Sequence, residues 1–210
     1  MSTVAWCLIL ARWSGYGREH AHARTFAIWD WALMVFAMMM PLVFGHIRFT
    51  ATRSLWRRRQ RAILEFVCGY ASVWLLVGVA VSASLSVVGV THLLNGRWMP
   101  AAAFGAASIW QLAPWRRRAL AACHRTMPLA PRGWRADRDC LRYGGAIGTR
   151  CVMTCGVLML GCVFAGHGML AMLTATAIVG AEGYYVRADE RSTSAVLGFV
   201  AVAYALLRPY

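Results

Sequence analysis

The stretch FAIWDWALMVFAMMMPLVFG, residues 26–45, holds a single charged side chain in twenty positions. An α-helix needs about 20 predominantly apolar residues to cross the hydrocarbon core of a bilayer. The stretch therefore predicts a membrane-spanning helix, in which Trp29 and Trp31 anchor the beginning at the membrane interface. Pro41 lies inside the stretch and withdraws one backbone hydrogen bond, which predicts a kink.

The whole chain has the same apolar character. Hydrophobic residues make up 60% of its 210 residues, the mean hydropathy is +0.52, and only eight residues are acidic. These values are typical of an integral membrane protein. The formal net charge is +14, and the basic residues, all of them Arg, lie between the apolar stretches. This placement indicates topology signals and contacts with acidic lipid head groups rather than nucleic-acid binding.

The apolar stretches predict an all-α fold, a polytopic membrane helix bundle of about six transmembrane helices. Sixteen of the 22 Arg residues fall in residues 46–61, 115–143 and 187–191, which the positive-inside rule assigns to the cytoplasm. The layout is that of a multi-pass protein of the bacterial inner membrane with both ends outside and an amphipathic cytoplasmic segment within 115–143. Residues 1–25 form a polar N-terminal lead, and residues 26–210 form one transmembrane domain. The predicted spans cover residues 26–45, 62–90, 98–114, 144–165, 169–186 and 192–207.

Sulfur side chains line one face of the fourth predicted span. In RCVMTCGVLMLGC, residues 150–162, a helix places Cys151, Cys155, Met159 and Cys162 within about 80° of one another. Thiol and thioether sulfur favour monovalent copper, with zinc the next candidate for the thiolates. The alternative is packing, because free Cys and Met commonly fill apolar interiors.

The first predicted span offers a second row of sulfur. Counted from the inner ends of their helices, Met38 lies level with Cys151, and Met34 lies level with Cys155. If the two helices are neighbours, the rows face each other and form a site or relay for Cu(I).

Three acidic residues fall in or at the edges of the spans, where a carboxylate is costly and is a functional candidate. Asp30 is near the outer end and can be solvated, and Glu65 can pair with Arg61. Glu182 lies deeper, and two roles stay open for it: a functional carboxylate or a structural partner of Arg150.

Several classes of protein lack support in the sequence. It contains no G-x-S-x-G, P-loop, H-E-x-x-H or Rossmann motif. No His lies in the middle of a predicted span and no C-x-x-C-H occurs, which disfavours haem. The C-x-x-x-C spacing is one residue longer than that of a thiol oxidoreductase. A non-enzymatic role is therefore favoured.

Four stretches stand in order along the chain: WALMVFAMMMP at residues 31–41, FVCGYASVW at 66–74, WQLAPWRRRALAACHR at 110–125 and CVMTCGVLM at 151–159. FAGHGM and Glu182 follow them. Together they resemble the domain-of-unknown-function 2182 family, whose members are described as predicted metal-binding integral membrane proteins.

The resemblance implies metal-binding motifs at particular residues. The family's Met pair falls on Met38 and Met39, the end of its loop motif on Cys123, and its Cys cluster on Cys151 and Cys155. The chain departs from the family pattern at three positions, where the family has Cys, Cys and Asn: Ala119, Thr154 and Leu170.

The leading hypothesis is a polytopic membrane protein that binds a soft metal, most plausibly Cu(I), for transport, delivery or cuproprotein assembly. Its partners would be membrane lipids, a metallochaperone or other subunits of a membrane complex. One alternative is an accessory subunit of a larger complex with no metal of its own, and another is a membrane redox or haem-handling enzyme. The candidate metal ligands are Cys151, Cys155, Met34 and Met38, followed by Met39, Met159, Cys162, Met169 and Glu182.

Overall fold

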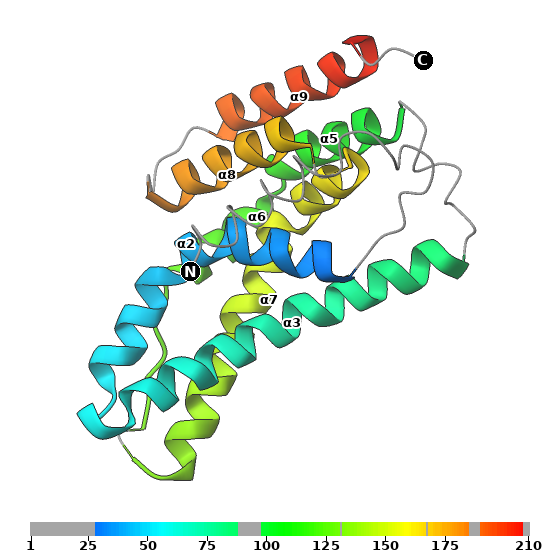
Figure 1. Cartoon of the computed structure of the whole chain (residues 1–210). Coiled ribbons are helices and arrows are strands. Elements are labelled where there is room, and N and C mark those ends of the chain that lie inside the picture. The colour runs from blue at the N-terminus through cyan, green and yellow to red at the C-terminus, as the bar shows by residue number, and fades with distance from the viewer. Residues whose placement is uncertain (1–27, 88–97, 131, 167, 185–189, 208–210) are drawn as a thin grey trace.

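The structure, a computed structural model, describes residues 28–87, 98–130, 132–166, 168–184 and 190–207. Within these ranges every regular element is a helix, which confirms the predicted all-α helix bundle (Figure 1). The predicted polar lead, residues 1–25, lies outside the described residues. The helices are α2 (Ile28–Arg53), η1 (Trp56–Arg58), α3 (Arg59–Val87), α5 (Trp98–Gln111), α6 (Pro114–Cys123), α7 (Trp134–Phe164), α8 (Met169–Tyr184) and α9 (Glu190–Leu207).

Three helical segments of the described chain are long and apolar enough to cross a membrane: α2, Trp56–Ser86 and α7. Two further apolar segments, Met169–Glu182 and Ser192–Leu206, are shorter. The 14 residues of α5 extend only about 21 Å at the usual helical rise. The membrane character of the long segments agrees with the sequence, while the count of six spans stays a prediction.

Helix α7 begins at Trp134, well before the predicted boundary at residue 144. The polar beginning of α7 is held by ion pairs to the beginning of α3. Arg58 and Arg61 both pair with Asp137, and the Arg61 Nη2 to Asp137 Oδ2 distance is 2.7 Å. Arg61 also pairs with Glu65 at 2.9 Å, as predicted. These pairs extend the helix beyond the apolar segment that defined the predicted span.

Helices α3 and α7 cross at close range because two glycines remove side chains from the contact. A Cβ atom added at Gly69 would overlap the carbonyl oxygen of Leu141, and one added at Gly144 would overlap that of Phe66. Small residues at such crossings let helix backbones approach in a membrane. This crossing brings Tyr70 of α3 to the same level as the Cys residues of α7.

Helix α2 contains Pro41 and changes direction along its length, as the kink prediction requires (Figure 1). Trp29 and Trp31 are both predicted to be interfacial anchors, but only Trp29 is exposed. Trp29 is 74% exposed, whereas Trp31 is buried and donates a hydrogen bond from Nε1 to the carbonyl oxygen of Trp74 at 2.8 Å. The prediction for Trp31 is wrong because its face of α2 packs on α3.

Helix α6 lies against α7 instead of lying wholly on a membrane surface. It begins at Pro114, directly after the break that follows Gln111, the last residue of α5. Arg150 of α7 donates a hydrogen bond from Nη1 to the carbonyl oxygen of Ala122 at 2.8 Å. Arg116 of α6 is buried at 1% exposure. The amphipathic segment therefore also contributes to the core near the Cys residues.

Candidate metal centre

Three helices bring a sulfur group together around Cys151 of α7. Its Sγ lies 3.7 Å from the Sδ of Met39 on α2, and the hydroxyl of Tyr70 on α3 donates to it at 3.2 Å. All three side chains are buried. Residues separated by 112 positions in the sequence thus form one contact.

Cys155 lies one helical turn after Cys151 and is also buried. The two thiol groups interact directly, and both Cys residues are free. The Thr154 hydroxyl lies 3.4 Å from the Cys155 Sγ and donates a hydrogen bond to the Cys151 carbonyl oxygen at 3.0 Å. We call Met39, Cys151 and Cys155 the sulfur group.

The sulfur group suits a soft monovalent cation. Two thiols and one thioether are the donor types that select Cu(I) over hard cations. The hydroxyl of Tyr70 already donates to one sulfur, and such a hydrogen bond stabilises a thiolate better than a thiol. The described part of the chain holds no group of three or more His, Cys, Asp or Glu placed to bind a metal. Structural zinc needs four ligands of those kinds, so the sulfur group fits copper better.

Met34 and Met38, which form the predicted row of sulfur side chains on α2, are both buried in the protein core. The contact with Cys151 comes from Met39, whereas the depth count favoured Met38. Neighbouring residues point about 100° apart around a helix, so a change in helix direction decides which side chain faces α7. Met34 and Met38 are buried members of the same core.

The remaining sulfur candidates lie further along the bundle. Met159 and Cys162 continue the stripe on α7 and are buried. The Cys162 thiol is directed to the carbonyl oxygen of Ala171 on α8, at 3.8 Å. Met169 begins α8 and is partly exposed. Cys162 is about 10 Å from Cys155 along the helix axis. These residues extend the soft interior beyond the sulfur group.

Glu182 of α8 forms a buried ion pair with Arg116 of α6. The predicted pairing with Arg150 is wrong, because α6 folds onto α7 and brings Arg116 inside, while Arg150 binds a backbone carbonyl. Arg116 also donates from Nε to the carbonyl oxygen of Thr154, at 3.1 Å. The acidic candidate is thus linked to the sulfur group through a cation.

The sequence reasoning missed Tyr70 and Arg116. Arg116 was counted only as a topology signal, but Arg116, Leu120 and Cys123 have the spacing of one helix face. That spacing would have indicated that the first Arg of WRRR points with an apolar and a thiol side chain toward the protein. Tyr70 carried no local signal, because its partner is reached only through the α3–α7 crossing.

A further thiol and two imidazoles gather near the sulfur group, at the end of α6. Cys123 interacts with Cys155, and burial raises the pKa of the Cys123 thiol to about 11. The His46 ring hydrogen bonds to the backbone of Cys123 and lies near His124, and its Nδ1 is 2.6 Å from the hydroxyl of Tyr143. Because its pKa is raised to about 11, the Cys123 thiol is protonated at neutral pH.

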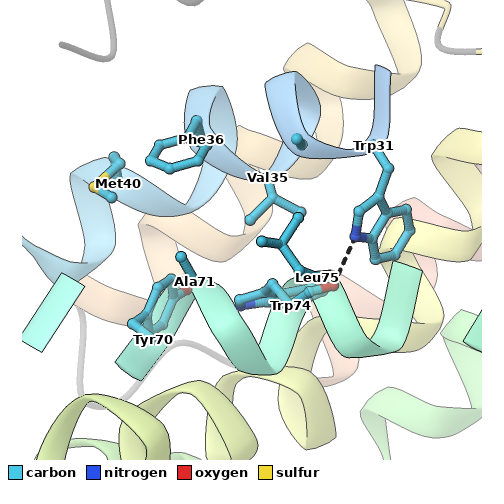
Figure 2. A pocket seen from close by; sticks show the side chains of 9 residues that line it. Trp31, Val35, Phe36, Met40, Tyr70, Ala71, Trp74 and Leu75 are labelled. Atoms are coloured by element: carbon cyan, nitrogen blue, oxygen red, sulfur yellow. Dashed lines mark hydrogen bonds between the residues drawn. The ribbon is translucent and has the colours of Figure 1, made fainter. Parts of the chain in front are cut away.

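A small apolar groove lies between α2 and α3 (Figure 2). The Trp31 hydrogen bond to the carbonyl oxygen of Trp74 crosses one end of it, and Met40 lies at the other. Tyr70 lines the groove with its ring while its hydroxyl contacts Cys151. The groove is lined by Trp31, Ala32, Val35, Phe36, Met40, Tyr70, Ala71, Trp74 and Leu75.

A family model described as PpoB2, copper chaperone, matches residues 28–207. The match includes Met39, Cys151 and Cys155, and also Arg116 and Glu182. No curated protein and no solved structure matches the chain.

Proposed function

The chain belongs to the PpoB2 family of copper chaperones, and we propose that it holds Cu(I) at the sulfur group within the membrane and delivers it for cuproprotein assembly. The observation that carries this proposal is the buried contact of Met39 with Cys151, beside the thiol of Cys155. The donors are soft sulfurs, which select Cu(I) as the cargo.

The donor set supports binding followed by release. Two thiolates provide the charge that holds Cu⁺, while the thioether of Met39 is a neutral and weaker donor. A copper-accepting protein with thiol or imidazole ligands can replace the thioether first and the thiolates afterwards. Since every metal-bound sulfur is buried, the copper is kept from solvent until such a partner arrives.

The remaining candidate ligands have supporting places in this proposal. Met34, Met38 and Met159 are soft side chains in the same buried core as the sulfur group, Cys162 is directed to α8, and Met169 begins α8. Glu182 acts through Arg116. The Met and Cys motifs of the domain-of-unknown-function 2182 family support the same assignment for Met39, Cys151 and Cys155.

We also propose the cellular setting. The protein resides in the bacterial inner membrane with six spans and cytoplasmic Arg-rich loops, which contact acidic lipid head groups. The three long apolar helical segments support this location. A metallochaperone or a copper-requiring protein is the partner that the family description supports.

The test is the metal content of detergent-purified protein after anaerobic loading with Cu(I). We expect about one copper per wild-type chain, since the sulfur group has donors for a single ion. A Cys151→Ser/Cys155→Ser variant should lose that copper while it stays folded. The matched control is Cys68→Ala/Cys140→Ala, which also removes two free Cys and should keep the copper.

Equal, substoichiometric copper in the wild type and in both variants would refute the copper site. Loss of copper in the control alone would move the site to another part of the chain. Co-purification of other subunits with a metal-free chain would instead support an accessory role.

A further inference from the structure

Arg116 is a cation placed inside the protein beside the proposed copper ligands. It is 1% exposed, and its partner Glu182 is 4% exposed. Arg116 has several hydrogen-bonding nitrogens: Nε donates to the carbonyl oxygen of Thr154, and Nη2 pairs with Glu182. Nη1 is buried and has no hydrogen-bond partner among the described residues. A buried donor without a partner is costly, so its retention requires a reason.

The position of Arg116 relates it to Cys123 on its own helix, α6, and to Cys155 on α7. Thr154, which accepts its Nε hydrogen bond, directly precedes Cys155. Arg116 and Cys123 lie seven residues apart on α6, which places them on one face of that helix. The positive member of the ion pair is therefore bound to the backbone directly before Cys155.

Copper loading changes the charge at this place. Two thiols lose two protons and receive one Cu⁺, so the bound complex carries one negative charge. A charge buried in an apolar interior is costly unless an opposite charge compensates it. Another guanidinium on these helices, that of Arg150, donates to the carbonyl oxygen of Ala122.

We infer that Arg116 is the charge-compensating residue of the copper complex, and that Glu182 holds Arg116 in place while the site is empty. This inference rests on the proposed function. In the loaded protein, Nη1 of Arg116 donates to a copper-bound thiolate. The anionic complex and Glu182 bind different nitrogens but compete for the positive charge of one guanidinium, and this competition limits affinity to a level from which copper can be released.

The experiment compares Cu(I) affinity in purified protein by competition with a chromophoric copper chelator. Glu182→Gln removes the competitor, so copper should bind about tenfold more tightly, a change equal to ~1.4 kcal/mol. Adding Arg116→Gln to Glu182→Gln should remove this gain and leave affinity below that of the wild type. Arg116→Lys in the Glu182→Gln background keeps the charge and should restore most of the affinity.

A second readout separates charge compensation from a structural role. Glu182→Gln leaves a buried cation, so the empty variant should unfold at a lower temperature than wild type. The anionic copper–dithiolate complex supplies the missing negative charge, so copper loading should raise the melting temperature of Glu182→Gln by more than that of the wild type. A merely structural ion pair gives equal increments.

Each outcome bears on one proposal. Stoichiometric copper in the wild type with unchanged affinity in the three variants overturns the role of Arg116 and leaves the copper site intact. Absence of copper from the wild type refutes the proposed function itself. If Glu182→Gln does not fold, the neutral Arg116→Gln/Glu182→Gln variant decides alone, because replacing both partners of a buried pair is tolerated. Wild-type affinity in that variant would overturn the inference.

Discussion

At the scale of the residue, Cys151 is the centre of the proposed site because it meets a thioether, a hydroxyl and a second thiol. Each contact comes from a different position: Met39 on α2, Tyr70 on α3, and Cys155 on its own helix. A Met or Cys that only fills space needs no such set of polar and sulfur partners. The contacts thus favour a binding role for this part of the stripe over simple packing.

Exchanging single Met residues tests which thioether binds copper. We expect Met39→Leu to weaken Cu(I) binding about tenfold while stability changes little, since Met and Leu differ by less than about 1.5 kcal/mol in cores. Met38→Leu is the matched control, because Met38 directly precedes Met39 in the chain and is also buried. Chelator competition measures both variants. Weaker binding only in Met38→Leu would restore the pairing that the depth count favoured.

At the scale of the element, the site depends on how closely α3 approaches α7. Gly69 and Gly144 allow the backbones to touch, and the approach brings Tyr70 against Cys151. The α2 helix joins the same centre through Met39 and through His46, which contacts Tyr143. The helices therefore act as supports whose spacing fixes the positions of the donors.

Two adjacent glycines on α7 allow a matched test of this spacing. Gly144→Ala should destabilise the protein by about 2–3 kcal/mol, because its Cβ would overlap the carbonyl oxygen of Phe66. Gly145→Ala should be neutral or stabilising by about 0.5–1 kcal/mol, since its Cβ meets Gly69 only at 3.8 Å. Thermal unfolding in detergent gives the comparison. Equal stability of the two variants would contradict the close crossing.

At the scale of the whole molecule, long apolar helices combine with an uneven distribution of Arg. The polar beginnings of α3 and α7 meet in the cluster of Arg58, Arg61, Glu65 and Asp137, which marks one end of the bundle. The loop before α7 is rich in Arg as well. By the positive-inside rule, we propose that this end faces the cytoplasm.

Labelling of introduced thiols tests this orientation. In a background without the accessible native Cys residues, Met127→Cys should react with a membrane-impermeant maleimide in inverted vesicles only. Met127 is 38% exposed in the connection between α6 and α7. Leu170→Cys, at the beginning of α8 and 78% exposed, should react in right-side-out vesicles only. The reverse pattern would invert the topology.

Much of the architecture follows from local properties of the sequence. Apolar runs of sufficient length predict helices that can cross a membrane. Two further features are also short-range: the helix break between Gln111 and Pro114, and the ion pair of Glu65 with Arg61. The stripe of Cys151 and Cys155 is equally local, because one helix turn sets it. Helix α7 begins at Trp134, before its apolar stretch, because hydropathy marks where a helix is apolar and polar turns can precede that point.

By itself the sequence determined the helical class, the apolar segments and the soft chemistry of the α7 stripe, all of which arise from neighbouring residues. Only the tertiary structure decided that Met39 faces Cys151, that Tyr70 donates to it, and that Arg116 pairs with Glu182. The physical reason is that these contacts depend on the rotation, bend and crossing of separate helices. Periodicity along one helix specifies which residues share a face, but the packing of the helices decides which face of a neighbouring helix contacts them.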